Sequence, residues 1–167
     1  IYYSTFSDGE SPLKESSNII IDNCSFKWKY PLWYSNDVLV EDSKLDVTAR
    51  SGIWYTHNIT INDTLIEAPK TFRRSSFITL NNVNMPNALE TMWNCKNIVL
   101  NDVNVTGDYF AFGSQNIEAN NLVINGIDKN IGTLILIILV LFLNISSSDN
   151  SPMFFLLTIL HNETYPS

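Results

Sequence analysis

Residues Asn97 to Val105 read Asn-Ile-Val-Leu-Asn-Asp-Val-Asn-Val, and this nine-residue pattern recurs along most of the chain. Copies of the pattern begin at Asn18, Asp37, Asn58, Phe77, Asn97 and Asn116. The intervals between successive copies are therefore 19, 21, 19, 20 and 19 residues. A period near twenty residues, with one supersecondary unit in each repeat, is typical of a solenoid.

Each copy alternates apolar and polar residues, which is the pattern of a β-strand with one buried face. The two apolar columns are Ile19, Val38, Ile59, Ile78, Ile98 and Ile117, and then Ile21, Val40, Ile61, Leu80, Leu100 and Ala119. An Asp or Asn follows in every copy, at Asn23, Asp42, Asp63, Asn82, Asp102 and Asn121. Because Asp and Asn tolerate a left-handed backbone, we expect a corner at each of these positions.

After the corner, a second apolar alternation predicts a second short strand that faces the same interior. Its columns are Cys24, Ser43, Thr64, Val83, Val103 and Leu122, and then Phe26, Leu45, Ile66, Met85, Val105 and Ile124. A third strand is predicted through the inward column Leu13, Leu32, Ile53, Phe72, Met92 and Ala111. Three positions after each of these comes a small residue, at Ser16, Ser35, Thr56, Ser75, Cys95 and Ser114.

Three short strands per coil, with β-branched interiors and Asn-rich corners, predict an all-β fold: a right-handed, single-stranded parallel β-helix of the pectin-lyase type. Leucine-rich repeats share this period, but their leucines and their helical half-repeat are missing from this sequence. We place the repeat domain at residues 1–130, with coils at 1–16, 17–35, 36–56, 57–75, 76–95, 96–114 and 115–130.

The repeat stops after Asn130, and we treat residues 131–167 as a separate, apolar, non-repeat tail. Residues 134–143 are all apolar. In the wider run 131–145, the residues that are not apolar are Gly132, Thr133 and Asn144. Because a helix needs ~20 apolar residues to span a bilayer, we expect no membrane span here. The tail is either a cap on the open end of the solenoid or sequence from a shifted reading frame.

Composition limits the partners. The chain has 167 residues and a net charge of −7, and no run of Lys and Arg forms a basic stripe, so nucleic acid is not an expected partner. The chain starts with Ile inside a repeat, so we interpret it as a fragment whose beginning is missing. Cys24 and Cys95 lie three coils apart, or about 14 Å at ~4.8 Å per coil, too far for a disulfide. We expect two packed free thiols, which favour the cytoplasm over secretion.

Three stretches of sequence resemble a known family. They are residues 9–16, Gly-Glu-Ser-Pro-Leu-Lys-Glu-Ser, and the recurring Leu-Trp-Tyr-Ser at 32–35 and Ile-Trp-Tyr-Thr at 53–56. On these, the chain resembles the bacterial pectin-lyase-like β-helix proteins grouped as domain of unknown function three-seven-three-seven. The resemblance covers about residues 1–130 and not the tail. That family has no assigned activity, so the resemblance implies the fold and supplies no catalytic residue.

Carboxylate pairs are the first candidates for catalysis. Glycoside hydrolysis needs two carboxylates ~5–10 Å apart, and residues of one column on adjacent coils come close to that spacing. Asp42 with Asp63, and Asp22 with Glu41, are such pairs. The first pair, however, lies in the column that is Asp or Asn in every coil, and forming the corner already explains it.

Other catalytic chemistries find little support in the sequence. A lyase would combine clustered acids that hold Ca²⁺ with a basic residue, and Arg73-Arg74 is a basic pair without such acids in the neighbouring coils. His57 and His161 are the only histidines, too few for a His-based zinc site or triad. We therefore expect no catalytic residue, no cofactor and no metal.

The better functional candidate is an outward aromatic column, Lys14, Trp33, Trp54, Arg73, Trp93 and Phe112, which comes one residue after the inward column. Tryptophans at one-coil spacing would offer a flat ladder on which sugar rings or an extended chain could stack. In the alternative interpretation, Arg73 stacks on Trp54 and Trp93, and the ladder only stabilises the face. We interpret the chain as a non-catalytic binding or structural module for a carbohydrate or a protein. The other possibility is a fragment of a polysaccharide lyase or glycoside hydrolase.

Overall fold

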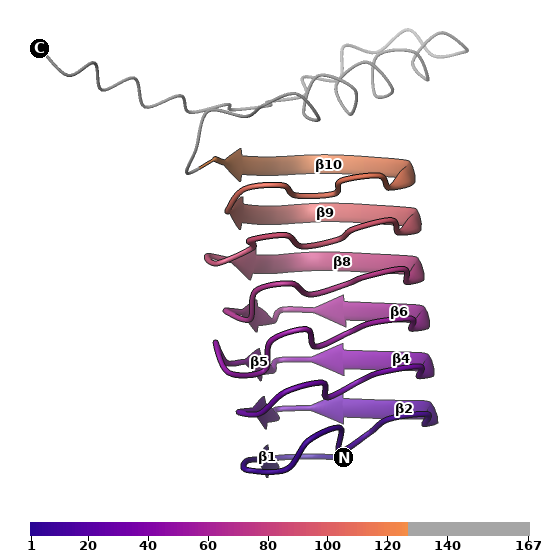
Figure 1. Ribbon diagram of the computed structural model, residues 1–167, viewed down its shortest axis with the longest axis vertical. Coiled ribbons are helices and arrows are strands. Elements are labelled where there is room, and N and C mark those ends of the chain that lie inside the picture. The colour runs from indigo at the N-terminus through magenta and orange to yellow at the C-terminus, as the bar shows by residue number, and fades with distance from the viewer. Residues whose placement is uncertain (127–167) are drawn as a thin grey trace, which may run out of the picture.

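The computed structural model describes residues 1–126, which form a β-solenoid of coils stacked along one axis (Figure 1). The long strands are β2 (Ser17–Asp22), β4 (Asn36–Glu41), β6 (His57–Asn62), β8 (Ser76–Met85), β9 (Lys96–Thr106) and β10 (Gln115–Asn125). The short strands are β1 (Thr5–Phe6), β3 (Ser25–Phe26), β5 (Lys44–Leu45) and β7 (Leu65–Ile66). All of them belong to one parallel sheet, so the predicted parallel solenoid is confirmed.

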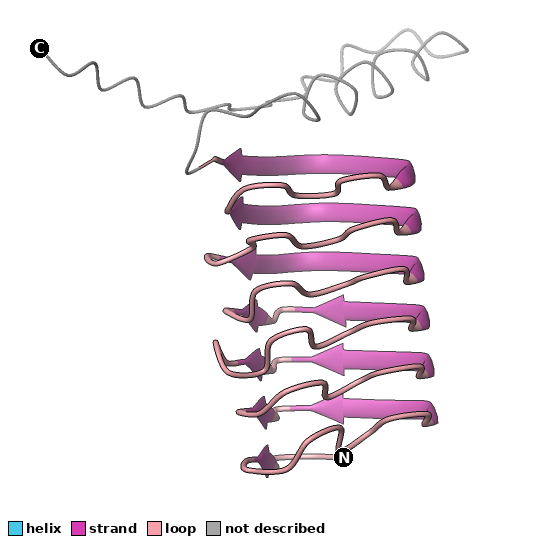
Figure 2. Ribbon diagram, viewed as in Figure 1, coloured by secondary structure: helices cyan, strands magenta, loops and turns pink. Residues whose placement is uncertain are grey.

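The strand register follows the sequence columns. Ile59 pairs with Ile78, Ile78 with Ile98, and Ile98 with Ile117, so each residue meets its equivalent one coil away. The N-terminal residues obey the same rule, because Phe6 pairs with Phe26 and the two rings stack at 4.6 Å. The described residues contain strands and loops and no helix, hence no helix that could cross a membrane (Figure 2).

The predicted inward columns form the core. Ile59, Ile78 and Ile98 are buried, as are their neighbours two residues later and the columns that begin at Cys24 and Phe26. The members that are only partly buried, Leu13, Ile19 and Ile117, lie toward the two ends of the described solenoid. A further inward column of small residues was missed from the sequence: Ala49, Ala68, Ala88 and Gly107. At Gly107 an added Cβ would lie 2.6 Å from the backbone of the Ala88 turn.

The expected corners are confirmed at the Asp and Asn column, whose residues all have positive φ, from 44° at Asp42 to 54° at Asn121. The first residue of each repeat forms a second bend that the sequence reading missed, with φ from 52° at Asp37 to 56° at Asn97. Side-chain amides link both columns from coil to coil. Asn82 Nδ2 donates to Asp63 Oδ1 at 2.6 Å, and Asn116 Nδ2 to Asn97 Oδ1 at 2.9 Å.

The residue after the corner decides whether the strand continues. Ser43 and Thr64 occupy this position in two coils, and their hydroxyls accept a backbone N–H from the preceding coil. The Cys24 N–H donates to Ser43 Oγ at 3.0 Å, and the Ser43 N–H donates to Thr64 Oγ1 at 3.3 Å. A side-chain oxygen then takes the place of a backbone carbonyl in the ladder, so the strands before and after the corner are separate. Where Val83 and Val103 stand there, the backbone ladder continues, and β8 and β9 run through the corner.

The third segment keeps its predicted place and its inward column, but it forms isolated parallel bridges in place of a continuous strand. These bridges join Trp54 to Arg73 and Arg73 to Trp93. The reason is the backbone, because Phe72, Arg74 and other residues of this segment have positive φ, 58° and 51° for these two. Left-handed residues interrupt the extended geometry that a strand needs.

The small residues of this segment face inward and link the coils. Thr56 N–H donates to Ser75 Oγ at 3.1 Å, and Ser75 Oγ donates to Ile53 O at 3.1 Å. Cys95 takes the same place in its coil, with its N–H donating to Ser114 Oγ at 2.9 Å. Both cysteines are free and buried, as expected. The expectations for residues 131–167 and for the end of the last coil at 130 lie outside the described residues.

Cys95 gives the solenoid a stability that depends on pH. Burial raises the pKa of its thiol to about 11, because the packed interior disfavours the thiolate. An unfolded chain ionises the thiol near pH ~8.5, so the stabilisation is complete below that pH and is lost as the pH rises toward 11. Over that window we expect the free energy of unfolding to fall by roughly 2–3 kcal/mol more than in a variant without the thiol.

The matched variant is Cys95→Ser, since serine occupies this column in neighbouring coils. Denaturant unfolding of both proteins from pH 7 to pH 11 measures the difference. Equal pH dependence in the two proteins would show that the thiol is solvated in the folded state.

Candidate binding face

The predicted aromatic column is a continuous outward row on the third segment. Trp33, Trp54, Arg73 and Trp93 are partly exposed, and Phe112 is 48% exposed. Each follows directly after a buried residue of the inward column. Lys14 lies at the N-terminal end of the row, where its Nζ is 3.5 Å from Glu15 Oε1. The structure thus places the whole expected set of residues on one face.

The aromatic rings of this row stack on each other. The Trp33 and Trp54 ring centroids are 5.2 Å apart with an angle of 7° between the planes. The Arg73 guanidinium carbon lies 5.0 Å from the Trp54 centroid and 5.2 Å from that of Trp93. Trp93 meets Phe112 at 5.5 Å. Ring faces are therefore largely covered by neighbouring coils, and the surface presents ring edges.

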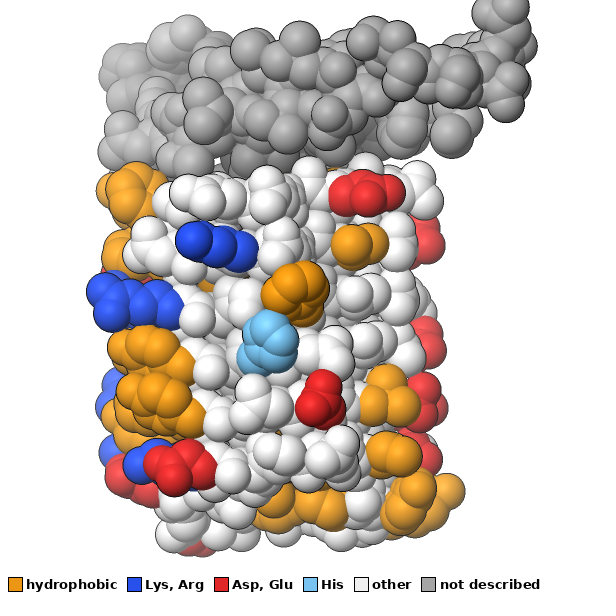
Figure 3. Space-filling view, turned by 90° about the vertical axis from the view of Figure 1, so that its right-hand side faces the viewer, with side chains coloured by type: hydrophobic (Ala, Val, Ile, Leu, Met, Phe, Trp, Pro, Cys, Tyr) orange, Lys and Arg blue, Asp and Glu red, His pale blue; other side chains and the backbone are white. Residues whose placement is uncertain are grey.

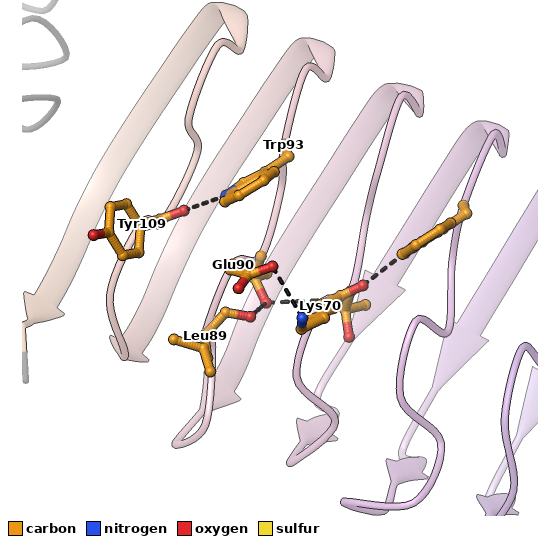
Figure 4. A network of polar contacts seen from close by, with 8 residues as sticks. Lys70, Leu89, Glu90, Trp93 and Tyr109 are labelled. Carbon is orange, nitrogen blue, oxygen red and sulfur yellow. Dashed lines mark hydrogen bonds and ion pairs between the residues drawn. The ribbon is translucent and has the colours of Figure 1, made fainter.

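The indole N–H groups connect each coil to the next. Trp33 Nε1 donates to Ser51 O at 2.6 Å, Trp54 Nε1 to Lys70 O at 2.7 Å, and Trp93 Nε1 to Tyr109 O at 2.7 Å (Figure 4). All three acceptor residues have positive φ, between 55° and 59°. The tryptophans therefore satisfy carbonyls of left-handed turn residues, in addition to packing on one another.

Ion pairs reinforce the turns beside this row. Lys70 N–H donates to Leu89 O at 2.8 Å, and Lys70 Nζ lies 3.1 Å from Glu90 Oε2 (Figure 4). Equivalent pairs join Lys29 to Glu10 at 2.6 Å and Lys44 to Glu67 at 2.9 Å. The hydrogen bond from Lys44 to Glu67 raises the pKa of Lys44. Each pair joins adjacent coils, although exposed pairs of this kind contribute only modestly to stability.

A second outward column was missed from the sequence. Tyr34 and Tyr55 stack at 4.6 Å with 5° between their planes, and each meets the preceding tryptophan edge-on at 6.4 Å. In a strand, the residue after an outward tryptophan would point inward. Tyr34 and Tyr55 point outward because both are left-handed, with φ of 56° and 59°. The repeated Trp-Tyr dipeptide was the signal that could have revealed them.

We call these two columns together the aromatic face. It comprises Trp33, Trp54, Arg73, Trp93 and Phe112 in one column, and Tyr34, Tyr55 and Arg74 in the next. Tyr34 is 46% exposed, and within residues 1–126 the two tyrosine hydroxyls have no hydrogen-bond partner. The face therefore offers apolar ring edges beside unengaged phenol and guanidinium donors.

The carboxylate candidates are engaged at the corners. Asp42 and Asp63 both have the left-handed corner backbone, and Asp63 accepts the hydrogen bond from Asn82. Asp22 accepts from Asn23 Nδ2 at 2.8 Å, and Glu41 from Asn62 Nδ2 at 3.2 Å. Corner formation accounts for Asp42, and hydrogen bonds from neighbouring Asn side chains account for Asp22, Glu41 and Asp63.

Two further polar features involve residues outside the two aromatic columns. A hollow of about 350 Å³ is lined by Asn82, Asp102, Asn104 and Asn121. His57 Nδ1 lies 2.9 Å from Ser76 Oγ, and its ring meets Phe77 edge-on. In residues 1–126, no three His, Cys, Asp or Glu side chains are grouped so that they could hold a metal ion.

Comparison with known families decides the relationship. Residues 1–129 match the family described as "Protein of unknown function (DUF3737)". The chain belongs to this family. The DUF3737 match covers the repeat and stops just where the columns end, in agreement with the resemblance seen in the sequence. No curated protein matches the chain, and no solved structure matches it.

The contacts of Trp54 predict that it is needed for stability. Trp54→Ala would remove the stack with Trp33 and Arg73 and leave the Lys70 carbonyl without its donor. We expect a loss of roughly 2–4 kcal/mol in the free energy of unfolding. Trp54→Phe keeps an aromatic ring but removes the N–H and part of the indole, so its expected cost is smaller, about 1–2 kcal/mol. Thermal and denaturant unfolding measure both, and an unchanged stability in Trp54→Ala would contradict the role of the stack.

Proposed function

We propose that this DUF3737 chain is a non-catalytic module that binds an extended carbohydrate along the aromatic face. The observation that supports the proposal is the second outward column. Tyr34 and Tyr55 place hydroxyls with no partner in the described residues directly beside the edges of Trp33 and Trp54. The stacked tryptophans alone would be explained by stability, whereas these hydroxyls contribute no contact to the fold.

The repeat makes the face suitable for a polymer. Coils succeed one another at ~4.8 Å, so a chain lying along the solenoid axis would meet similar groups at each coil. Ring edges would pack against the apolar C–H groups of sugars, and phenol hydroxyls would exchange hydrogen bonds with sugar hydroxyls. A few polar groups within an otherwise apolar surface are typical of sites that orient their ligand.

The same proposal assigns the solenoid to the bacterial pectin-lyase-like, right-handed β-helices. The period, the three-sided coil and the Asn-rich corners support this assignment. We propose a binding role in preference to a carbohydrate-active enzyme, because Asp63 and Glu41 accept hydrogen bonds from the neighbouring coil and Asp22 accepts one from Asn23. A protein partner is the competing outcome for the same face.

The tyrosine hydroxyls provide the test. The double variant Tyr34→Phe, Tyr55→Phe removes two oxygens and leaves the ring stack intact, so its melting temperature should stay within about 2 °C of the parent, since exposed substitutions cost little. On a glycan array, followed by titration of the best polysaccharide, we expect the variant to bind about tenfold more weakly, as the loss of one or two hydrogen bonds implies.

Tyr3→Phe is the matched control, because Tyr3 is exposed and lies in the first coil away from the aromatic face. It should bind like the parent. The proposal is wrong if the parent binds no polysaccharide, or if the double variant binds as tightly as Tyr3→Phe.

A further inference from the structure

Most Lys side chains in residues 1–126 have an acidic partner, but the basic side chains on the aromatic face do not. Lys29, Lys44 and Lys70 each pair with a Glu of an adjacent coil. Arg73 and Arg74 form no ion pair with any residue of the described part of the chain. Lys96 is also exposed and unpaired there. The chain therefore places three unpaired cations on or next to the aromatic face.

These three cations lie close together. Lys96 pairs in register with Ser76, which is two residues after Arg74. Two residues of chain span at most ~7 Å and adjacent coils are ~4.8 Å apart, so the Cα atoms of Arg74 and Lys96 are no more than about 12 Å apart. Figure 3 shows Lys and Arg side chains beside hydrophobic ones along one edge of this face. The basic groups and the aromatic edges thus belong to one surface.

Arg73 is held in a geometry suited to a carboxylate. Its guanidinium carbon lies 5.0 Å from the ring centroid of Trp54 and 5.2 Å from that of Trp93, so the side chain is restrained between the two rings. A guanidinium presents its N–H donors as a planar fork that matches a carboxylate. Because the two rings already restrain the side chain, binding would cost it little conformational entropy.

The net negative charge of the whole chain does not prevent a carboxylate from binding at these cations. Among the residues that occupy the position of Arg74 in other coils, the acidic one is Glu15. It lies three coils away and next to Lys14. That distance is about 14 Å, beyond the ~8 Å over which charges interact at physiological ionic strength. The neutral residues Tyr55 and Asn94 occupy the intervening and following positions of that column. Within that column, no acid therefore lies within ~8 Å of Arg74.

We propose that the ligand is an anionic polysaccharide, whose carboxylates bind Arg73, Arg74 and Lys96 while its sugar rings lie against the aromatic edges. This inference rests on the carbohydrate-binding function proposed above and narrows it to carboxylate-bearing chains. A sugar polymer fits better than a purely ionic partner, because the cations are few and lie beside ring edges and phenol hydroxyls.

The test compares one polymer with and without its charge. The full chain is titrated with a uronate polysaccharide, alginate, and with the same alginate after chemical reduction of its carboxyl groups. We expect at least tenfold tighter binding of the acidic form, with an affinity that falls as salt rises. The variant Arg74→Gln, Lys96→Gln should lose that preference and keep its binding to the reduced polymer. Lys27→Gln, which removes an exposed cation directly after β3, should behave like the parent.

The two proposals fail in different ways. Equal binding of the acidic and reduced polymers would overturn the anionic ligand and leave the carbohydrate-binding function standing. Binding of neither polymer, together with no binding on the array, would overturn both. A preference for the acidic form that survives in Arg74→Gln, Lys96→Gln would refute the assignment of these residues. Equal competition by poly-glutamate would show that charge alone is recognised and would also overturn the inference.

Discussion

The parallel pairing of each coil with the next, in register, is the constraint on which the rest of this structure depends. Because the register never slips, every side chain meets its own equivalent one coil away. A column of isoleucines therefore becomes a continuous strip of core, and a column of aromatic residues becomes a stack. Parallel strands need a crossover connection, and the turns of the solenoid supply it without helices in the described residues.

The same constraint determines how polar groups are satisfied. Hydroxyls of Thr56 and Ser75 and amides of Asn82 and Asn116 bond across coils, and the indole N–H groups do the same for the turn carbonyls. In residues 1–126, no buried side-chain nitrogen or oxygen lacks a partner. Buried polar groups that are unpaired destabilise the folded state. A repeat that places donor columns beside acceptor columns pairs these groups in every coil.

The predictable part of this molecule was the part with strict periodicity. The inward columns through Ile19, Cys24, Phe26 and Leu32, the corners at Asp42 and its equivalents, and the outward tryptophans all follow from spacing alone. The conformation of the third segment could not be predicted from spacing. The alternation of inward and outward residues assumes an extended backbone, whereas residues such as Phe72, Tyr55 and Arg74 are left-handed. Left-handed Tyr and Phe are uncommon, so nothing in their residue type signals that conformation.

This difference matters for the function. The sequence suggested an open ladder of ring faces, whereas the stack directs the faces of Trp54 toward its neighbours and its N–H toward the next coil. Under the proposed function, ligand recognition would use ring edges and the groups beside them. Tyr55, Arg74 and their equivalents are those groups, and their outward direction depends on the left-handed backbone.

Hydrogen exchange of the four indole N–H protons, followed by NMR, tests this account most directly. Trp33, Trp54 and Trp93 donate to carbonyls of the next coil, while Trp28 has no such bond within the described residues and serves as an internal reference. The account predicts three protons that exchange slowly and one, from Trp28, that exchanges fast. Four protons that exchange at the same fast rate would show that the tryptophans do not connect successive coils.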